Sequence, residues 1–308
     1  MTGPRPRDPK LPASHVDLLD RPLPAVLTTE MSDGRLQSTV VWCKREGGDV
    51  LLNTMREFQK ARNLRARPRA TVLVMEPGGD ERWIEVRGRV ELEEDGALEH
   101  LDELSRLYAG AAPYFGAVVP ADLAAGEHPL RVRLVPTAVR TGPSSVRPDI
   151  PRCTLPLPGH WGRRRGCEDD VPISETHRDL LERPIDAALA TCMPDGSAQT
   201  QPVWFELEGN DVLVNTTRER RKGANLEADP RATLLVIDPD DDGRWIEIRG
   251  DVDLIGEGAA DQLDRLTRRY TAHERYYGSI YPEEQRERET RVIARIHPRR
   301  IVRDAIHR

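Results

Sequence analysis

A short basic segment is spelled twice in this chain, as NTMREFQKARNL from Asn53 and as NTTRERRKGANL from Asn215. In the first copy Arg56, Lys60 and Asn63 follow the i, i+4, i+7 spacing that places side chains on one face of a helix. A helix N-terminus carries partial positive charge and free N–H groups, and cations on the adjacent turns add to that field. This combination is suited to binding a phosphate or another anion.

The second copy keeps the same three polar positions as Arg218, Lys222 and Asn225. A solvated basic face is the alternative interpretation, and it would be sufficient for a single helix of this kind. Preservation of the three positions in both copies favours anion binding, although duplication by itself also preserves residues.

A capping box precedes each basic face and competes with that interpretation. Thr54 and Glu57 form the T-x-x-E pattern, which predicts a helix over 54–67, and Thr216 and Glu219 repeat it. A capping box satisfies N–H groups that an anion would otherwise use.

The basic segments belong to a much longer internal repeat with an offset of 162 residues. The two copies align without a gap, and more than half of the positions in 18–92 are identical to their counterparts. Solenoid repeats have periods of only about 20–50 residues, so the pattern indicates two copies of one domain. The predicted divisions are a first domain over 15–140, a Pro- and Arg-rich linker over 141–176 and a second domain over 177–302.

Each copy has the pattern of short strands with two helices. In the first copy Asp33-Gly34 is a hairpin signal, and 82–92 alternates between apolar and polar residues as a half-buried antiparallel strand does. Residues 97–109 form an amphipathic helix pattern. Six short antiparallel strands with two helices predict a small closed barrel. The predicted strands cover 25–30, 35–45, 50–53, 69–76, 82–92 and 130–140.

Composition narrows the function classes. The chain has 308 residues, enough for two domains, and its net charge of -6 argues against a dedicated nucleic-acid binder. It has no apolar run of the roughly 20 residues that a membrane span needs. No apolar signal segment is visible in MTGPRPRDPK, and four cysteines without a CxxC pair indicate a reducing, cytoplasmic location.

Two cysteines in the linker flank a histidine. Cys153, His160 and Cys167 could form part of a metal site, but unpaired loop thiols are the favoured interpretation, and we predict no metal.

The order of these motifs resembles a known family. The series DG-x-x-Q-x-x-x-VW, then NT-x-RE…K-x-x-NL…PRAT, then RWIE-x-RG is similar to the pyridoxamine 5'-phosphate oxidase-like split β-barrel proteins, and most similar to their F420 (deazaflavin)-dependent branch. The resemblance covers both copies, about four fifths of the chain. Such proteins are usually homodimers with two cofactor sites at the subunit interface. The resemblance therefore implies a mainly β chain with helices. Its two split β-barrel, FMN-binding-like domains would form an intramolecular pseudo-dimer, and the chain could then be monomeric.

The resemblance also assigns residues to cofactor binding. The family's phosphate-binding helix falls on the two basic segments, and the strand beside the flavin ring falls on 37–42 and 199–204. The first copy has Arg62 where the family often has arginine, whereas the second has Ala224 there and adds Arg220. The assigned residues are Gln37, Val41, Trp42, Asn53, Thr54, Arg56, Lys60, Arg62 and Asn63, and Gln199, Val203, Trp204, Asn215, Thr216, Arg218, Arg220, Lys222 and Asn225.

The implied function is an oxidoreductase that moves a hydride between reduced F420 and a small organic substrate. Such chemistry requires no protein nucleophile, and no catalytic residue is assigned. An FMN enzyme of the same fold is the first alternative, and a non-catalytic flavin or haem carrier, or an empty scaffold that binds a protein partner, is the second. The two sites are expected to be asymmetric, with one binding cofactor and the other substrate or nothing.

Four further residues have two interpretations. Arg87 and Arg249 could hold an acidic cofactor tail, but ion pairing with a neighbouring glutamate is the simpler interpretation. Trp42 and Trp204 could pack on the cofactor ring or within the barrel.

Overall fold

The computed structural model describes residues 10–77, 82–142 and 171–304. The first repeat begins with the 3-10 turn Val16–Leu19 and contains seven strands and two α-helices in the described residues. Its strands and helices are β1 (Ala25–Glu30), β2 (Leu36–Val41), β3 (Cys43–Glu46), β4 (Asp49–Met55), α1 (Gln59–Ala66), β5 (Arg69–Met75), β6 (Trp83–Glu93), α2 (Ala97–Ala109) and β7 (Pro129–Gly142).

The second repeat has the same order of elements, preceded by a short helix in place of the 3-10 turn. Its elements are α3 (Glu175–Glu182), β8 (Ala187–Cys192), β9 (Ala198–Val203), β10 (Phe205–Glu208), β11 (Asp211–Thr217), α4 (Arg221–Ala228), β12 (Arg231–Asp238), β13 (Asp241–Ile255), α5 (Ala259–Tyr270) and β14 (Arg291–Arg303).

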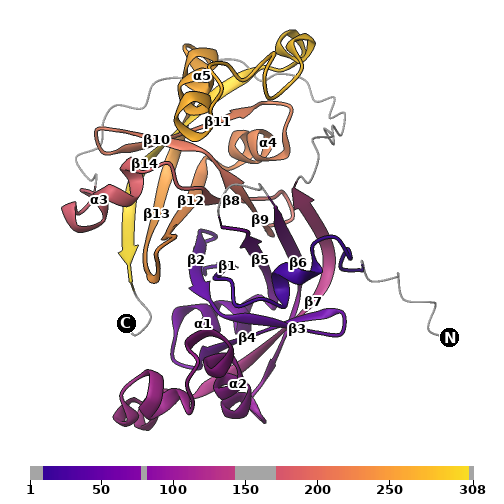
Figure 1. Ribbon diagram of the computed structural model, residues 1–308, viewed down its shortest axis with the longest axis vertical. Helices are drawn as coiled ribbons and strands as arrows, with labels where there is room; N and C mark the ends of the chain where they lie inside the picture. Colours follow the sequence, from indigo (N-terminus) through magenta and orange to yellow (C-terminus); the bar gives the residue numbers. More distant parts are fainter. Residues whose placement is uncertain (1–9, 78–81, 143–170, 305–308) are drawn as a thin grey trace, which may run out of the picture.

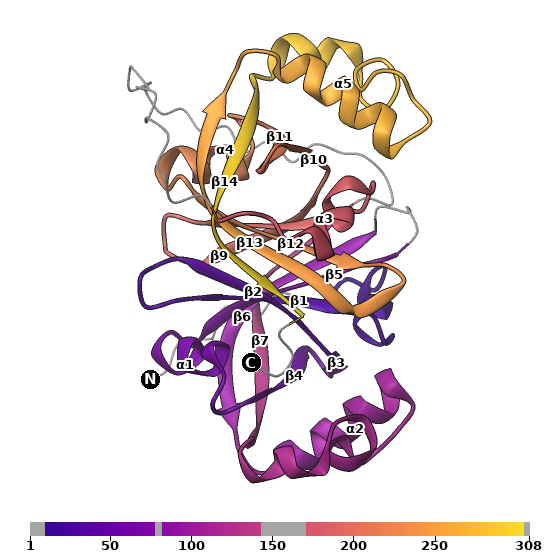
Figure 2. The same cartoon turned by 90° about the vertical axis from the view of Figure 1, so that its left-hand side faces the viewer.

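Each repeat folds into one curled antiparallel sheet of seven strands. The strand order is β2-β1-β5-β6-β7-β4-β3 in the first sheet and, read in the same direction, β9-β8-β12-β13-β14-β11-β10 in the second. Figures 1 and 2 show the two sheets meeting at the middle of the molecule, with α2 and α5 at opposite ends. The chain is thus a split β-barrel repeated twice and arranged as an intramolecular pseudo-dimer.

The predicted strand over 35–45 is two strands, which is why each sheet has seven strands rather than six. β2 ends at Val41 and β3 begins at Cys43, so Trp42 lies at the break. β2 pairs with β1, whereas β3 pairs with β4 on the other edge of the sheet. The break therefore carries the chain from one edge of the sheet to the other, which curls it into a barrel.

Each barrel encloses its own apolar core. Alternation along β6 directs Ile84, Val86 and Val90 into the first core, as the sequence pattern predicts. The opposite face of β6 packs against the second repeat at its start, where Glu85 is completely buried, and is exposed at Arg89 and Glu91.

The capping-box prediction is wrong, and the helix starts later than expected. Thr54 lies in β4, where it pairs with Leu130 of β7, and α1 begins only at Gln59. The Glu57 carboxylate accepts a hydrogen bond from the His128 backbone N–H at 3.1 Å instead of capping the helix. The second repeat differs from the prediction in the same way. Pairing with a neighbouring strand outweighed the local helix signal.

The contacts across the seam between the repeats are related by a pseudo-two-fold axis. The Thr71 hydroxyl donates to the Ala198 carbonyl at 2.7 Å, and the equivalent Thr233 hydroxyl donates to the Leu36 carbonyl at 2.8 Å. Such reciprocal contacts are the signature of an isologous dimer interface, here within one chain. An apolar cluster drawn from both repeats fills the middle of the seam, and it includes Val26, Leu73, Ala188, Leu235, Ile237 and Trp245.

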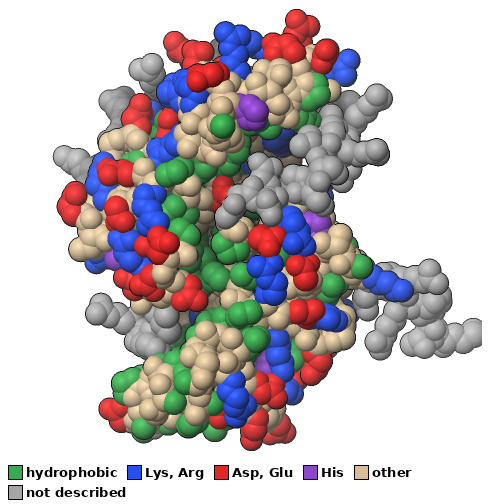
Figure 3. All heavy atoms as spheres, viewed as in Figure 1, with side chains coloured by type: hydrophobic (Ala, Val, Ile, Leu, Met, Phe, Trp, Pro, Cys, Tyr) green, Lys and Arg blue, Asp and Glu red, His purple; other side chains and the backbone are tan. Residues whose placement is uncertain are grey.

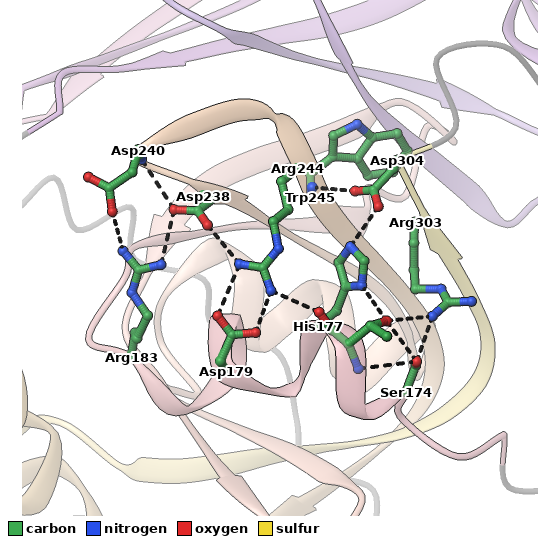
Figure 4. A network of polar contacts seen from close by, with 11 residues as sticks. Ser174, His177, Asp179, Arg183, Asp238, Asp240, Arg244, Trp245, Arg303 and Asp304 are labelled. Carbon is green, nitrogen blue, oxygen red and sulfur yellow. Dashed lines mark hydrogen bonds and ion pairs between the residues drawn. The ribbon is translucent and has the colours of Figure 1, made fainter.

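Ion pairs fix the hairpin that precedes the long central strand of each repeat. In the second repeat Arg244 joins Asp179 of α3 to Asp238 at the end of β12 (Figure 4). In the first repeat Arg82 pairs with Asp17 at 2.7 Å in the equivalent place. Figure 3 shows charged side chains of both signs over both repeats, with hydrophobic side chains visible between the two halves. No helix in the described residues is both long and apolar enough to cross a bilayer.

Candidate functional site

The two lysines of the basic segments lie in the first turns of α1 and α4. Lys60 is the second residue of α1, and Lys222 is the second residue of α4. Both side chains are partly buried, and neither ammonium has a hydrogen bond or ion pair with another described residue. Buried cations are normally paired, so the two ammonium groups are the strongest indication of a ligand.

The N-termini of both helices lack a side-chain cap. Phe58 and Arg220 occupy the N-cap positions, and neither provides a capping hydrogen bond. The N–H groups of the first turn therefore keep their attraction for an anion. The competition expected from a capping box does not exist in this structure.

The first candidate site consists of Lys60, Phe58, the edge strand β2 and Glu247 of the second repeat. The Lys60 Nζ lies 5.8 Å from the centroid of the Phe58 ring. Burial lowers the pKa of Lys60 to about 8, and the opposite charge of Glu247 partly offsets that effect. Glu247 also accepts a hydrogen bond from the Ser38 N–H of β2 at 2.7 Å, which places it beside the edge strand. Both repeats thus contribute to the first site.

The second candidate site consists of Lys222, Arg220, Arg291, the edge strand β9 and Glu85 of the first repeat. Burial lowers the pKa of Lys222 to about 7, and the positive charges of Arg220 and Arg291 lower it further. Glu85 accepts a hydrogen bond from the Thr200 N–H of β9 at 2.8 Å. The second site is therefore built like the first, but it gathers three cations.

A single carboxylate and two tyrosines hold the arginines of the second site. Arg291 donates to Glu289 at 2.6 Å and to the Tyr277 hydroxyl at 2.8 Å, and Arg220 donates to the other oxygen of Glu289 at 3.3 Å. The Arg291 guanidinium also lies 4.9 Å from the centroid of the Tyr276 ring. Sequence analysis missed Arg291, Glu289 and the tyrosines. Direct comparison of the two copies could have found Arg291, because the first copy has Pro129 at that position.

A buried amide network ties each helix to its edge strand. The Asn63 side-chain amide donates to Thr29 and to Gln37, each at 3.0 Å. Asn225 makes the same two contacts with Thr191 and Gln199, at 3.0 and 3.1 Å. Both asparagines are buried and their amides are engaged with the strands, so they hold each helix against its edge strand.

The edge strands present backbone groups to the seam. The Ser38 N–H and the Leu36 carbonyl both point across it, and residues two apart in a strand point the same way. The N–H and carbonyl of Val40 therefore also face away from β1, available to a ligand. Pro202 replaces Val40 in the second repeat and provides only a carbonyl.

The valine and tryptophan side chains of the edge strands point elsewhere. Val41 and Val203 belong to the two barrel cores, so only their backbone can touch a ligand. Trp42 stacks on Tyr108 of α2 with ring centroids 5.2 Å apart, and Trp204 stacks on Tyr270 at 5.4 Å.

Several of the predicted residues have partners within the protein. The Asn53 amide donates to the Ala97 carbonyl at the start of α2, and Asn215 makes the same contact with Ala259. Thr54 and Thr216 are buried in strands.

The predicted arginines divide in the same way. Arg56 lies before α1, is exposed and approaches Glu94 at 3.8 Å, so it does not share a helical face with Lys60. Arg62 is also exposed and donates to the Glu57 carbonyl at 2.7 Å. Arg218 pairs with Glu227. Only Arg220 among them lies near a site lysine.

The two strand arginines pair with glutamate, as the simpler interpretation predicted. Arg249 donates to Glu247 at 2.6 Å, and the Arg87 Nε lies 3.6 Å from Glu85. Burial raises the pKa of both glutamates. These pairs lie in the seam and leave no free guanidinium for an acidic cofactor tail.

Two other predicted features concern metals and cavities. The described residues contain no group of three or more His, Cys, Asp or Glu side chains that could hold a metal ion. Cys153, His160 and Cys167 lie outside the described residues. One hollow in the seam is lined by residues of the β1–β2 turn and of β2, β8, β12, β13 and β14. It includes Arg35, Cys192 and Arg231 but neither site lysine.

Two curled antiparallel sheets that share a seam, each with a short helix tied to an edge strand, define the class of split β-barrel proteins. The model of the pyridoxamine 5'-phosphate oxidase family matches residues 11–135 and 173–303, and the chain belongs to that family.

Solved structures similar to this chain each match a length close to one repeat. An F420 reductase is 30% identical, with a TM-score of 0.37 over 42% of this chain and 98% of its own. A conserved hypothetical protein from Mycobacterium tuberculosis is 26% identical, with a TM-score of 0.34 over 45% of this chain and 88% of its own. A putative pyridoxamine 5'-phosphate oxidase from Listeria innocua is 18% identical, with a TM-score of 0.32 over 41% and 93%. Among proteins of curated function, none matches this chain.

Proposed function

We propose that this chain is an oxidoreductase that binds F420 in the seam between its repeats and moves a hydride between that cofactor and a small organic substrate. The observation that carries the proposal is the pair of partly buried ammonium groups of Lys60 and Lys222, each at an uncapped helix start and without a hydrogen bond or ion pair to the part of the chain that the structure describes. A flavin-type cofactor matches this arrangement, because its phosphate complements the ammonium and its ring matches the backbone of an edge strand.

The protein's own residues bind and orient in this proposal. When bound, reduced F420 supplies the hydride. At a site that takes the cofactor, the lysine would hold a proton at Nζ and pair with the phosphate. The Gln37–Asn63 and Gln199–Asn225 contacts fix each helix against its edge strand, so that the ammonium and the strand backbone keep a constant separation. No protein nucleophile takes part.

The preference for F420 over FMN rests on the order of sequence motifs, and the phosphate site suits both cofactors. Titration of the purified protein with F420 and with FMN, followed by absorbance and fluorescence, distinguishes the two. We expect F420 to bind more tightly, and we expect the reduced form to be oxidised in the presence of an acceptor substrate. Tighter binding of FMN would assign the protein to FMN chemistry instead. Binding without turnover across a panel of acceptors would make it a carrier.

The double variant Lys60→Met and Lys222→Met tests the phosphate assignment. A hydrogen bond to a charged group contributes about 1.5–3 kcal/mol, so we expect the affinity for either cofactor to fall at least tenfold. Riboflavin, which has no phosphate, serves as the control ligand, and its affinity should change little. A double variant that binds both cofactors like the parent would refute the assignment.

The paired barrels also bear on the oligomeric state. Because one chain supplies both halves of a split-barrel pair, we propose that it acts as a monomer. From its cysteine pattern we propose a location in the cytoplasm. Light scattering coupled to size-exclusion chromatography should give the mass of a single chain.

A further inference from the structure

We infer that the two sites are not equivalent, and that the phosphate-bearing cofactor binds at the second site alone, one molecule per chain. This inference rests on the proposed function and specifies which half of the seam performs it. Arg220 and Arg291 are the residues that make the difference.

Two aligned positions carry the contrast. Phe58 of the first repeat becomes Arg220 in the second, and Pro129 becomes Arg291. In the first repeat the neighbour of the lysine is an aromatic ring, 5.8 Å from Nζ. In the second repeat both substituted residues are guanidinium groups close enough to Lys222 to repel its charge. An apolar neighbour and a prolyl residue have thus become two cations beside the same lysine.

The charges of the second site are not balanced within the protein. Three cationic side chains, Arg220, Lys222 and Arg291, gather around the carboxylate of Glu289, whereas the Glu85 carboxylate of the other repeat already faces Arg87. An arriving phosphate would relieve the repulsion among the three cations, and charge-assisted hydrogen bonds of this kind are among the strongest in proteins.

Arg291 is fixed in place before any ligand arrives. Its side chain is 8% exposed, and it donates to Glu289, to Tyr277 and to Asn215, the last at 3.3 Å. It therefore acts as a positioning residue that supplies a fixed charge. Arg220 is 39% exposed on its side chain and remains able to reach a ligand together with Lys222.

The first site has the opposite character. The charge that faces Lys60 from the second repeat is the carboxylate of Glu247, which is already paired with Arg249, and the aligned neighbours Phe58 and Pro129 bring no further cation. Where the second site has tyrosines and arginines, the first site has an apolar cluster that contains Phe58, the neighbour of Lys60. That cluster includes Trp42, Met55, Phe58, Leu101, Tyr114, Phe115, Val118 and Val119.

A titration of the full chain with F420, FMN and riboflavin tests the inference. We expect one equivalent of F420 or FMN per chain. Lys222→Met should weaken the affinity for FMN about 10- to 100-fold, whereas Lys60→Met should leave it within about twofold. The preference for FMN over riboflavin should be lost in Lys222→Met and retained in Lys60→Met.

Exchange of the contrasting residues gives an independent measurement. Arg220→Phe should lower the affinity for FMN about tenfold, and Phe58→Arg in that background should not restore the second site. Phe58→Arg in the parent should create weak binding of a second equivalent of FMN. The melting temperature of each variant controls for folding, and Phe58→Arg keeps the test decisive if Arg220→Phe does not fold.

The possible results separate the inference from the proposed function. Two equal equivalents per chain, or a single equivalent lost in Lys60→Met but not in Lys222→Met, would overturn the inference and leave the proposed function standing. Failure of the parent to bind either F420 or FMN would overturn both.

Discussion

The two lysine sites have the same backbone frame but different surroundings. Lys60 and Lys222 both lie in the first turn of an eight-residue helix tied by a buried asparagine to an edge strand. Around Lys60 are an aromatic ring and a carboxylate from the other repeat, whereas around Lys222 are two guanidinium groups. The comparison shows that duplication retained the parts that hold the fold, while the residues that decide what binds have diverged.

The contacts across the seam are among the features that both repeats retain. The glutamates of β6 and β13 each accept a backbone N–H from the other repeat, at 2.8 and 2.7 Å. These reciprocal contacts constrain both repeats at once, because a change in one repeat disturbs a contact with the other. The residues that flank the lysines are free of that constraint.

The largest expected effect is a loss of unfolding free energy that differs between the two buried glutamates of the seam. Arg249 has a 7% exposed side chain paired at 2.6 Å with Glu247, whereas Arg87 is 14% exposed and lies 3.6 Å from Glu85. Removing one partner of a buried pair leaves an uncompensated charge at a loss of about 3–5 kcal/mol. We expect Glu247→Ala to lower the free energy of unfolding by about that much and Glu85→Ala by less. Denaturant titration of both variants measures the difference, and equal losses would contradict the structural asymmetry.

Removing the buried asparagine amide is expected to destabilise the protein equally in the two repeats. Asn63→Ala and Asn225→Ala each remove a buried amide and leave its threonine and glutamine partners unsatisfied, which costs about 1–3 kcal/mol. Because the contacts are the same in both repeats, the two losses of unfolding free energy should agree within about 0.5 kcal/mol. Calorimetric or denaturant unfolding of the matched pair provides the measurement. A clear difference would show that the frames are not equivalent.

The affinity for a phosphate ligand should depend on pH at the second site. An ammonium must be protonated to pair with phosphate, and burial together with the positive charges of Arg220 and Arg291 lowers the pKa of Lys222 to about 7. Above about pH 7 binding therefore requires proton uptake, and the affinity for FMN should fall by up to tenfold per pH unit.

FMN titrations from pH 7 to 9 measure that slope, since the ligand phosphate keeps its charge over most of this range. Lys222→Met should abolish the slope. Lys60→Met should leave it unchanged, because the first site takes no phosphate in this scheme. A slope that survives Lys222→Met would assign the proton to another group.

The smallest effect is expected at Arg56, which the sequence places on the basic face and the structure places before the helix. Its side chain is exposed and approaches Glu94 at 3.8 Å. Exposed ion pairs contribute little, so Arg56→Ala should change the free energy of unfolding by less than about 0.5 kcal/mol. The affinity for FMN should stay within about twofold in a direct titration. A tenfold loss of affinity for FMN would instead indicate that Arg56 contacts the phosphate.

Much of the fold could be predicted because its signals are local. The alternation over 82–92 and the stripe over 97–109 correspond to β6 and α2, and the strand over 25–30 is β1. The helix start was wrong because Thr54 pairs with β7, a strand that lies far along the chain. Asn63 is buried and bonded to Thr29 and Gln37, contacts that helical spacing alone does not predict. Helical spacing shows which residues share a face but not which face another strand covers.

The sequence by itself determined that the chain is a tandem repeat, that each repeat is a small antiparallel barrel, and that a lysine recurs at one helix in each. These properties depend on periodicity, turn residues and self-similarity, which short segments carry. Only the tertiary structure decided that both helices lack side-chain caps, that Glu85 and Glu247 reach across the seam, and that Arg291 joins Arg220 beside Lys222. Those facts depend on charges and hydrogen bonds between residues that are distant in the chain, and such contacts exist only once the strands have paired.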